Sequence, residues 1–198
     1  MDMPKKPIRL AVIVGSTRQG RLGPTVAKWF IERARVHGGL DTDVIDLAEA
    51  GLPSELGGPP KEGKYASAEV NAYARRIAEA EAFVVVTPEY NRGYPAALKL
   101  AIDSVYAEWH AKPVGFVSHG GQSGGLRAVE QLRQVFAELH TVTVRDSVSF
   151  PMAWEQFDED GNPHDAEGAG VAAKQLLDEL VWWAEALRQA RADRPYAF

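Results

Sequence analysis

The sequence contains no cysteine at all. Disulfide bonds, zinc–thiolate sites, iron–sulfur clusters and thiol nucleophiles are therefore excluded. Long apolar runs are also absent, so no segment predicts a membrane span. Met1–Pro7 carries two lysines before only a short apolar run, which does not match a signal peptide. We therefore expect a cytoplasmic protein.

An excess of positive charge is missing as well. The formal net charge is −5, which excludes a generally basic nucleic-acid-binding protein. Hydrophobic residues make up 45% of the 198 residues, which is enough for a substantial core. No internal repeat or low-complexity linker divides the chain. We therefore expect a single domain over residues 1–198, with a loose tail over about 190–198.

Short apolar runs alternate with segments of helical periodicity along the whole chain. Strands are predicted over Ile8–Val14, Thr42–Leu47, Ala82–Thr87, Val114–Val117 and between residues 141 and 150. Helices are predicted to begin near Pro24, Ser67, Pro95 and Leu126, and a last helix contains Ala173 and Leu187. Continuous apolar strands alternating with helices are typical of a parallel sheet covered on both faces. We expect a flavodoxin-like α/β three-layer sandwich whose five-stranded sheet has the order 2-1-3-4-5.

In such a sheet the loops after the first, third and fourth strands meet at one edge, where ligands bind. The first loop combines glycines with the hydroxyl groups of Ser16 and Thr17 and the charges of Arg18 and Arg21. No acidic residue occurs between Asp2 and Glu32. Glycine-rich turns before a helix bind anions through backbone amides, so we favour a phosphate site over an ordinary turn with two solvated arginines.

The pattern of the first loop restricts the kind of phosphate ligand. Gly15 and Gly20 have the spacing of a Walker A loop, but Arg21-Leu22 replaces the required Lys-Ser/Thr. The dinucleotide motif G-x-G-x-x-G is absent too. A monophosphate such as that of FMN suits the turn better.

The other two loops are predicted to border a flat ring. The second runs Pro88-Glu89-Tyr90-Asn91-Arg92-Gly93-Tyr94, and the third runs Ser118-His119-Gly120-Gly121-Gln122-Ser123-Gly124-Gly125. Glycine lets the backbone approach a planar ligand closely. The alternatives are that the tyrosines only pack, and that the third loop is a flexible surface turn.

Together the three loops resemble the NADPH-dependent FMN reductase family, which includes quinone, azo-dye and chromate reductases. The resemblance rests on Gly15-Ser16-Thr17-Arg18, Thr87-Pro88-Glu89-Tyr90-Asn91 and Ser118-x-Gly120-Gly121, in this order along nearly the whole domain. It implies that Ser16, Arg18 and the adjoining backbone hold the FMN phosphate, and Thr17 stays a cofactor-binding candidate through its hydroxyl group. Many relatives carry serine where Arg21 stands, and we keep Arg21 as a candidate for the same role.

The resemblance also implies that Pro88, Glu89, Tyr90 and Asn91 contact the isoalloxazine ring and that Ser118, Gly120 and Gly121 border it. NADPH or NADH would be the electron donor, a small molecule such as a quinone the acceptor, and the assembly a homodimer or homotetramer. Because the redox chemistry takes place on the flavin, we assign no catalytic residue. Tyr94 and Trp109 are candidates for completing the pocket.

Two further features receive no role. His119 lies in the third loop, where it could deliver a proton or be merely structural. The segment from Asp158 to Asn162 is acidic but lacks the final glutamate of a calcium loop, so no metal is expected. A flavodoxin-like electron carrier and a non-catalytic FMN-binding module remain the alternative functions.

Overall fold

The computed structural model describes residues 6–197, in which five parallel strands form one sheet of order β2-β1-β3-β4-β5. This is the predicted strand order. The strands are β1 (Ile8–Val14), β2 (Leu40–Asp46), β3 (Ala82–Pro88), β4 (Pro113–His119) and β5 (Val142–Phe150).

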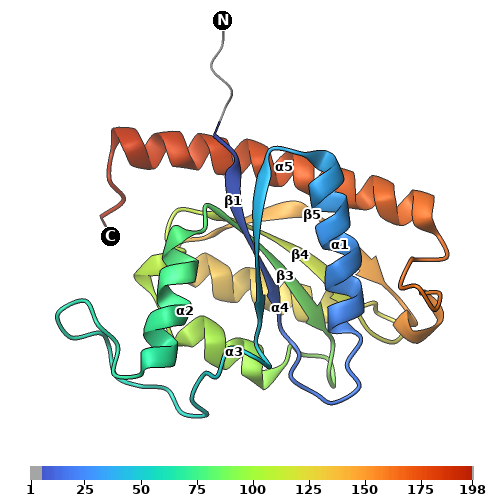
Figure 1. The fold of residues 1–198 in the computed structure, drawn as a ribbon, viewed down its shortest axis with the longest axis horizontal. Coiled ribbons are helices and arrows are strands. Elements are labelled where there is room, and N and C mark those ends of the chain that lie inside the picture. The colour runs from blue at the N-terminus through green and yellow to red at the C-terminus, as the bar shows by residue number, and fades with distance from the viewer. Residues whose placement is uncertain (1–5, 198) are drawn as a thin grey trace, which may run out of the picture.

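Helices cover both faces of the sheet, as Figure 1 shows. They are α1 (Gly23–His37), α2 (Ala68–Glu79), α3 (Ala96–Asp103), α4 (Leu126–Glu138) and α5 (Ala166–Asp193). Two short 3₁₀ turns, η1 (Ala107–Trp109) and η2 (Ala153–Glu155), follow α3 and β5. The arrangement is the predicted three-layer sandwich.

The two hydrophobic cores follow from the alternation of side chains along each strand. On β1, Val12 and Val14 face the core beneath α1 and α5, whereas Ala11 and Ile13 face the core beneath α2, α3 and α4. Both sets are buried, which explains why the central strands read as continuous apolar runs.

The observed elements extend beyond some predicted bounds. Strand β4 continues to His119, so this residue belongs to a strand rather than to a loop. Helix α5 continues to Asp193, so residues 190–193 of the segment expected to be loose are helical. The Tyr196 hydroxyl lies 2.8 Å from Nδ1 of His140, and Phe198 lies outside the described residues.

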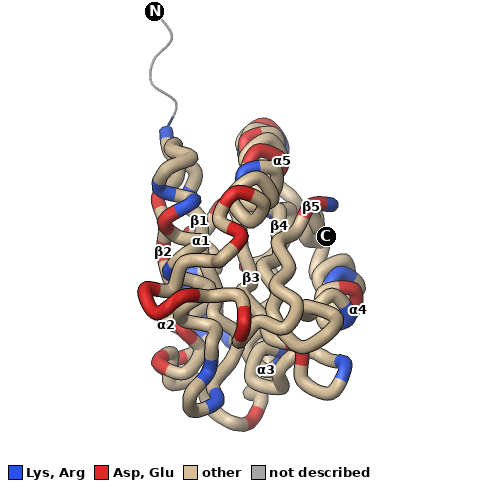
Figure 2. The backbone as a smooth tube through the Cα atoms, turned by 90° about the vertical axis from the view of Figure 1, so that its right-hand side faces the viewer, with Lys and Arg blue, Asp and Glu red and all other residues tan. Residues whose placement is uncertain are grey.

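The surface carries charges of both signs, mixed along α4 and α5 in Figure 2. Among residues 6–197, no helix combines the length and the apolar character that crossing a membrane requires. Because all five strands are parallel, their carboxyl ends meet at one edge of the sheet, and the loops of interest leave from there.

Candidate functional site at the carboxyl edge of the sheet

The β1–α1 loop presents backbone amides that the protein itself does not use. Within the described residues, six of them donate to no protein acceptor: those of Ser16, Thr17, Gln19, Gly20, Arg21 and Leu22. Helix α1 begins without a side-chain cap and has no acidic residue in its first turn. A helix N-terminus with free amides and a partial positive charge favours an anion. The predicted phosphate site therefore has suitable geometry.

Ser16 and Arg18 connect this loop to the second one. Ser16 is fully buried, and its Oγ lies 2.6 Å from the Tyr90 hydroxyl. The Arg18 guanidinium lies over the Tyr90 ring, 4.8 Å from its centroid, at cation–π distance. Two of the three predicted loops thus converge, as the topology required, and Tyr90 reaches the phosphate side of the site.

Arg21 is held differently from Arg18. One of its terminal nitrogens donates to Oδ2 of Asp46 at 2.6 Å, and both side chains are mostly buried. Asp46 ends β2 directly beside Val14, the last residue of β1. An internal partner therefore already engages one side of the Arg21 guanidinium.

The β3–α3 loop follows buried Pro88, the last residue of β3, and closes in a tight turn. Tyr90 and Gly93 exchange two backbone hydrogen bonds, of 2.8 Å and 3.1 Å. Asn91 and Arg92 between them have φ angles of 50° and 71°, as a hairpin-type turn requires. The turn exposes Asn91 at its tip, where the side chain remains accessible to a ligand.

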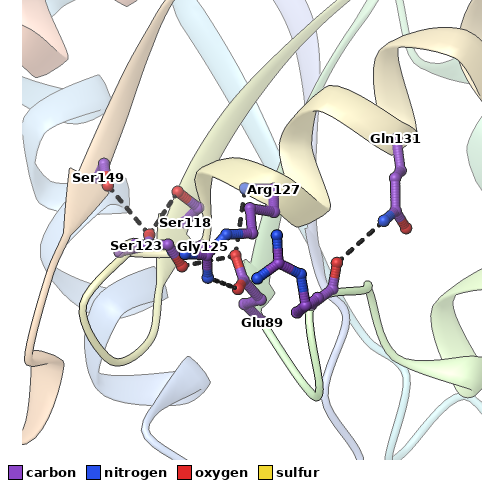
Figure 3. A network of polar contacts seen from close by, with 9 residues as sticks. Glu89, Ser118, Ser123, Gly125, Arg127, Gln131 and Ser149 are labelled. Atoms are coloured by element: carbon purple, nitrogen blue, oxygen red, sulfur yellow. Dashed lines mark hydrogen bonds and ion pairs between the residues drawn. The ribbon is translucent and has the colours of Figure 1, made fainter.

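Glu89 points from this loop toward the start of α4, as Figure 3 shows. Its carboxylate accepts from the Ser123 hydroxyl at 2.7 Å, from the Arg127 amide at 3.1 Å and from the Arg127 guanidinium at 2.8 Å. Burial alone would raise the pKa of Glu89, but the hydrogen bonds from Ser123 and Arg127 outweigh it and lower this pKa. Any contact of Glu89 with a cofactor would therefore involve its backbone.

The β4–α4 loop is built on close backbone packing. The hydroxyls of Ser118 and Ser149 both donate to the Gly124 carbonyl, at 2.8 Å and 3.0 Å (Figure 3). Gly125 has φ = 90°, and a Cβ there would lie 2.7 Å from Cβ of Ser118. Only glycine fits this position.

The same loop leaves a second group of amides free. The Gly120 amide donates to the Phe150 carbonyl at 3.2 Å. The next three amides, of Gly121, Gln122 and Ser123, have no acceptor in the part of the chain that the structure describes. Free consecutive amides suit the carbonyl oxygens of a flat polar ring.

His119 closes β4 beneath these loops and is only 6% exposed. Its Nε2 is buried without a hydrogen-bond partner, and burial lowers the pKa of His119 to about 4. A Cβ on Gly23, the first residue of α1, would lie 3.9 Å from this nitrogen. The imidazole is therefore neutral and belongs to the floor of the site.

A fourth loop, after β5, also belongs to this edge, and sequence reasoning missed it. The amides of Met152 and Ala153 donate to the carbonyls of Gly121 and Gly120, at 2.9 Å and 3.0 Å. Trp154 follows, 64% exposed, with its ring 3.8 Å from where a Cβ on Gly121 would lie. The available signal in the sequence is the tryptophan three residues after Pro151, just beyond the last strand.

The prediction that Trp109 completes the pocket is wrong. Trp109 is fully buried, its ring packs against Phe83 with centroids 4.7 Å apart, and its Nε1 donates to the Ile102 carbonyl at 3.1 Å. The turn η1 directs the side chain into the core beneath α2. Tyr94 is partly buried and packs against the same core.

The acidic segment near Asp158 forms a turn closed by its own backbone. The Asn162 amide donates to Oδ1 of Asp158 at 2.7 Å. Within residues 6–197 no three His, Cys, Asp or Glu side chains are grouped as a metal site would require.

The geometry fits FMN at both ends. Free amides, Arg18 and the start of α1 suit a phosphate, and the free amides at Gly121–Ser123 suit the polar edge of a ring. Fold and site together define a flavodoxin-like protein whose first loop presents free backbone amides at the start of a helix.

Comparison with known proteins gives the family. The model of the NADPH-dependent FMN reductase family matches residues 8–155, and the chain belongs to that family. It is 37% identical to the NAD(P)H-dependent FMN reductase C4B3.06c of Schizosaccharomyces pombe over 160 residues, covering 76% of this chain and 80% of the relative. It is 31% identical to the NADPH:quinone oxidoreductase of Arabidopsis thaliana over 183 residues, covering 89% and 91%.

Solved structures agree on the fold. The flavoenzyme NAD(P)H:(acceptor) oxidoreductase FerB of Paracoccus denitrificans matches with a TM-score of 0.68 and 26% identity, covering 90% of this chain and 98% of FerB. A flavodoxin of Streptococcus pneumoniae matches with a TM-score of 0.58 and 16% identity, covering 88% and 98%. The flavodoxin-like prediction is confirmed.

Proposed function

We propose that this protein is an NAD(P)H-dependent, FMN-containing oxidoreductase that passes electrons to a small acceptor such as a quinone. The observation that carries the proposal is the presence of two sets of free backbone amides at the same edge of the sheet. One set lies in the β1–α1 loop and the other in the β4–α4 loop. Membership of the FMN reductase family supports the same conclusion.

The phosphate would be bound by the β1–α1 loop. Its free amides would donate to the phosphate oxygens, together with the hydroxyl groups of Ser16 and Thr17. Arg18 would add a positive charge, and Arg21 would contribute through the part of its guanidinium that Asp46 leaves free. Ser16 can donate to the phosphate while accepting from the Tyr90 hydroxyl, which would fix its orientation.

The ring would lie between the second and third loops. Pro88–Asn91 would form one side, Ser118 and Gly120 would shape the other, and the Gly121–Ser123 amides would donate to the ring's oxygens. When bound, FMN supplies the group that accepts a hydride from a nicotinamide and passes electrons on. The protein would bind and orient the ring and leave one face open, so no protein nucleophile is needed.

The alternatives are an electron carrier that never meets a nicotinamide and a non-catalytic FMN-binding module. Steady-state oxidation of NADPH or NADH by the FMN-loaded protein, with a quinone as acceptor, separates the proposed enzyme from both alternatives. The proposal predicts turnover with at least one donor. The proposal would be refuted if the bound flavin stayed oxidised in excess NADPH and in excess NADH.

The phosphate assignment is tested by comparing FMN with riboflavin, which lacks the phosphate. Arg18→Ala should weaken FMN binding by about 1.5–3 kcal/mol, the range for a lost hydrogen bond to a charged group. Riboflavin binding should stay unchanged. Arg35→Ala is the control, because Arg35 lies near the C-terminal end of α1 and pairs with Glu32. Equal affinity of the wild-type protein for both flavins would contradict the assignment.

The proposed enzyme works in the cytoplasm as a homodimer or homotetramer. A single open face cannot hold nicotinamide and acceptor together, so the two should bind in turn and give ping-pong kinetics. Intersecting double-reciprocal lines would instead indicate a ternary complex. Light scattering tests the assembly: a monomer with full activity would refute the oligomer.

A further inference from the structure

The carboxylate of Glu89 joins two loops that are far apart in the sequence. Its side chain is only 7% exposed, and both oxygens accept hydrogen bonds from residues of the β4–α4 loop and of α4. In Figure 3, Glu89 points away from the tip of its own loop and into the first turn of α4. A general base would need an oxygen directed toward substrate, which this geometry does not provide.

Helix α4 lacks a cap from its own sequence. The residue at the N-cap position is Gly125, which has no side chain to offer. Glu89 satisfies the Arg127 amide in the first turn instead, and a carboxylate there also complements the helix dipole. The helix start therefore depends on a residue from the β3–α3 loop.

Backbone contacts reinforce the same junction. The Glu89 amide donates to the His119 carbonyl at 3.0 Å, and a Cβ on Gly120 would lie 3.4 Å from Cβ of Glu89. Nearer the tip of the loop, Nε2 of Gln131 on α4 donates to the Arg92 carbonyl at 2.9 Å. The β3–α3 loop is thus attached to the β4–α4 unit at two points.

From these contacts we infer that Glu89 is a positioning residue of the flavin site. It fixes the spacing between the β3–α3 loop and the β4–α4 loop and holds the free amides of Gly121–Ser123 in place for the ring. The inference rests on the proposed function, because the ring is what these loops would hold. Glu89 would then determine ring binding without contacting the ring through its side chain.

Flavin titrations test the inference. Glu89→Ala should weaken FMN and riboflavin binding by the same factor, about tenfold or more, because it disturbs the ring side only. Glu89→Gln keeps one acceptor oxygen but turns its NH₂ group toward a donor of Ser123 or Arg127, so it should restore only part of the affinity. Glu130→Ala is the matched control, since Glu130 also lies on α4 but its side chain is 75% exposed. An effect on FMN alone would overturn the inference.

Two readouts separate positioning from general stability. At saturating FMN, the absorption band of the flavin bound to Glu89→Ala should move toward that of free FMN, whereas a merely less stable protein would leave it unchanged. In the protein without flavin, hydrogen exchange should accelerate in residues 90–93 and 121–127 together, while β1 stays protected.

The outcomes are distinguishable. Unchanged exchange and unchanged flavin affinity in Glu89→Ala would overturn the positioning role and leave the proposed function intact. A wild-type protein that binds neither flavin would overturn the proposed function and this role with it. Exchange that accelerates in only one of the two loops would show that Glu89 does not couple them.

Discussion

Burial of His119 should make the stability of this protein fall in mild acid. The pKa of His119 is lowered from 6.5 to about 4 by burial, so between these values the unfolded chain binds a proton that the folded chain does not. The contribution is fully present above pH 6.5 and is lost as the pH falls toward 4. A protonated imidazole would also lie close to the positive end of α1.

The size of the effect follows from the two pKa values. Each pKa unit corresponds to about 1.36 kcal/mol, so the full loss approaches about 3 kcal/mol at low pH. Between pH 8 and pH 5, linkage gives a loss of about 2 kcal/mol in the free energy of unfolding. Burial also lowers the pKa of His110, and this residue and the carboxylates add their own pH dependence. The loss of unfolding free energy in the wild type alone therefore does not identify the contribution of His119.

The comparison of wild type with His119→Phe isolates the residue. Urea unfolding of the protein without flavin, followed by tryptophan fluorescence at pH 8 and pH 5, gives both free energies. Between pH 8 and pH 5, the free energy of unfolding of the wild type should fall by about 2 kcal/mol more than that of His119→Phe. His164→Gln is the control, because His164 is exposed in the folded protein as in the unfolded one. Equal losses in wild type and His119→Phe would refute the argument.

Three further predictions concern single residues. Tyr90→Phe removes the 2.6 Å contact with Ser16 and should weaken FMN binding by about 0.5–1.5 kcal/mol while leaving riboflavin unaffected, as measured by calorimetry. Gly125→Ala places a Cβ 2.7 Å from that of Ser118 at a positive φ and should cost at least about 2 kcal/mol in urea unfolding. Trp109→Leu should cost about 2–4 kcal/mol in the same assay yet leave FMN affinity unchanged, since Trp109 lies in the core. A weakened FMN affinity in Trp109→Leu would show that Trp109 contributes to the FMN pocket.

The sequence predicts the fold well because its signals are local. The run Ile8–Val14 is buried on both faces, and Pro88 and Gly15 mark strand ends that the structure keeps. The parallel order then dictates which loops meet. The bounds of β4 are less predictable, since His119 is polar, yet it pairs with Phe150 as the last residue of the strand.

The site is less predictable because its contacts cross between elements. The family resemblance assigns Ser118 and Glu89 to the cofactor, and the charge of its loop makes Arg21 a candidate. In the structure, their side chains bond to Gly124, Arg127 and Asp46. The Asp46 and Glu89 contacts have a signal in the topology, because β2 ends beside β1 and β3 ends beside β4. The direction in which a side chain leaves a loop depends on tertiary packing, which periodicity does not encode.

At the edge of the sheet, side chains and backbone have different roles. Polar side chains of the third loop tie loops together, while consecutive backbone amides remain free for a ligand. A ligand bound mainly by backbone amides requires an accurately held backbone, since a hydrogen bond weakens steeply when its donor is turned away from the acceptor. Rigid loop junctions such as that of Glu89 with Arg127 then matter as much as any residue touching the ligand. The glycines follow from the same need, because at Gly125 a side chain would displace the strand end that supports the loop.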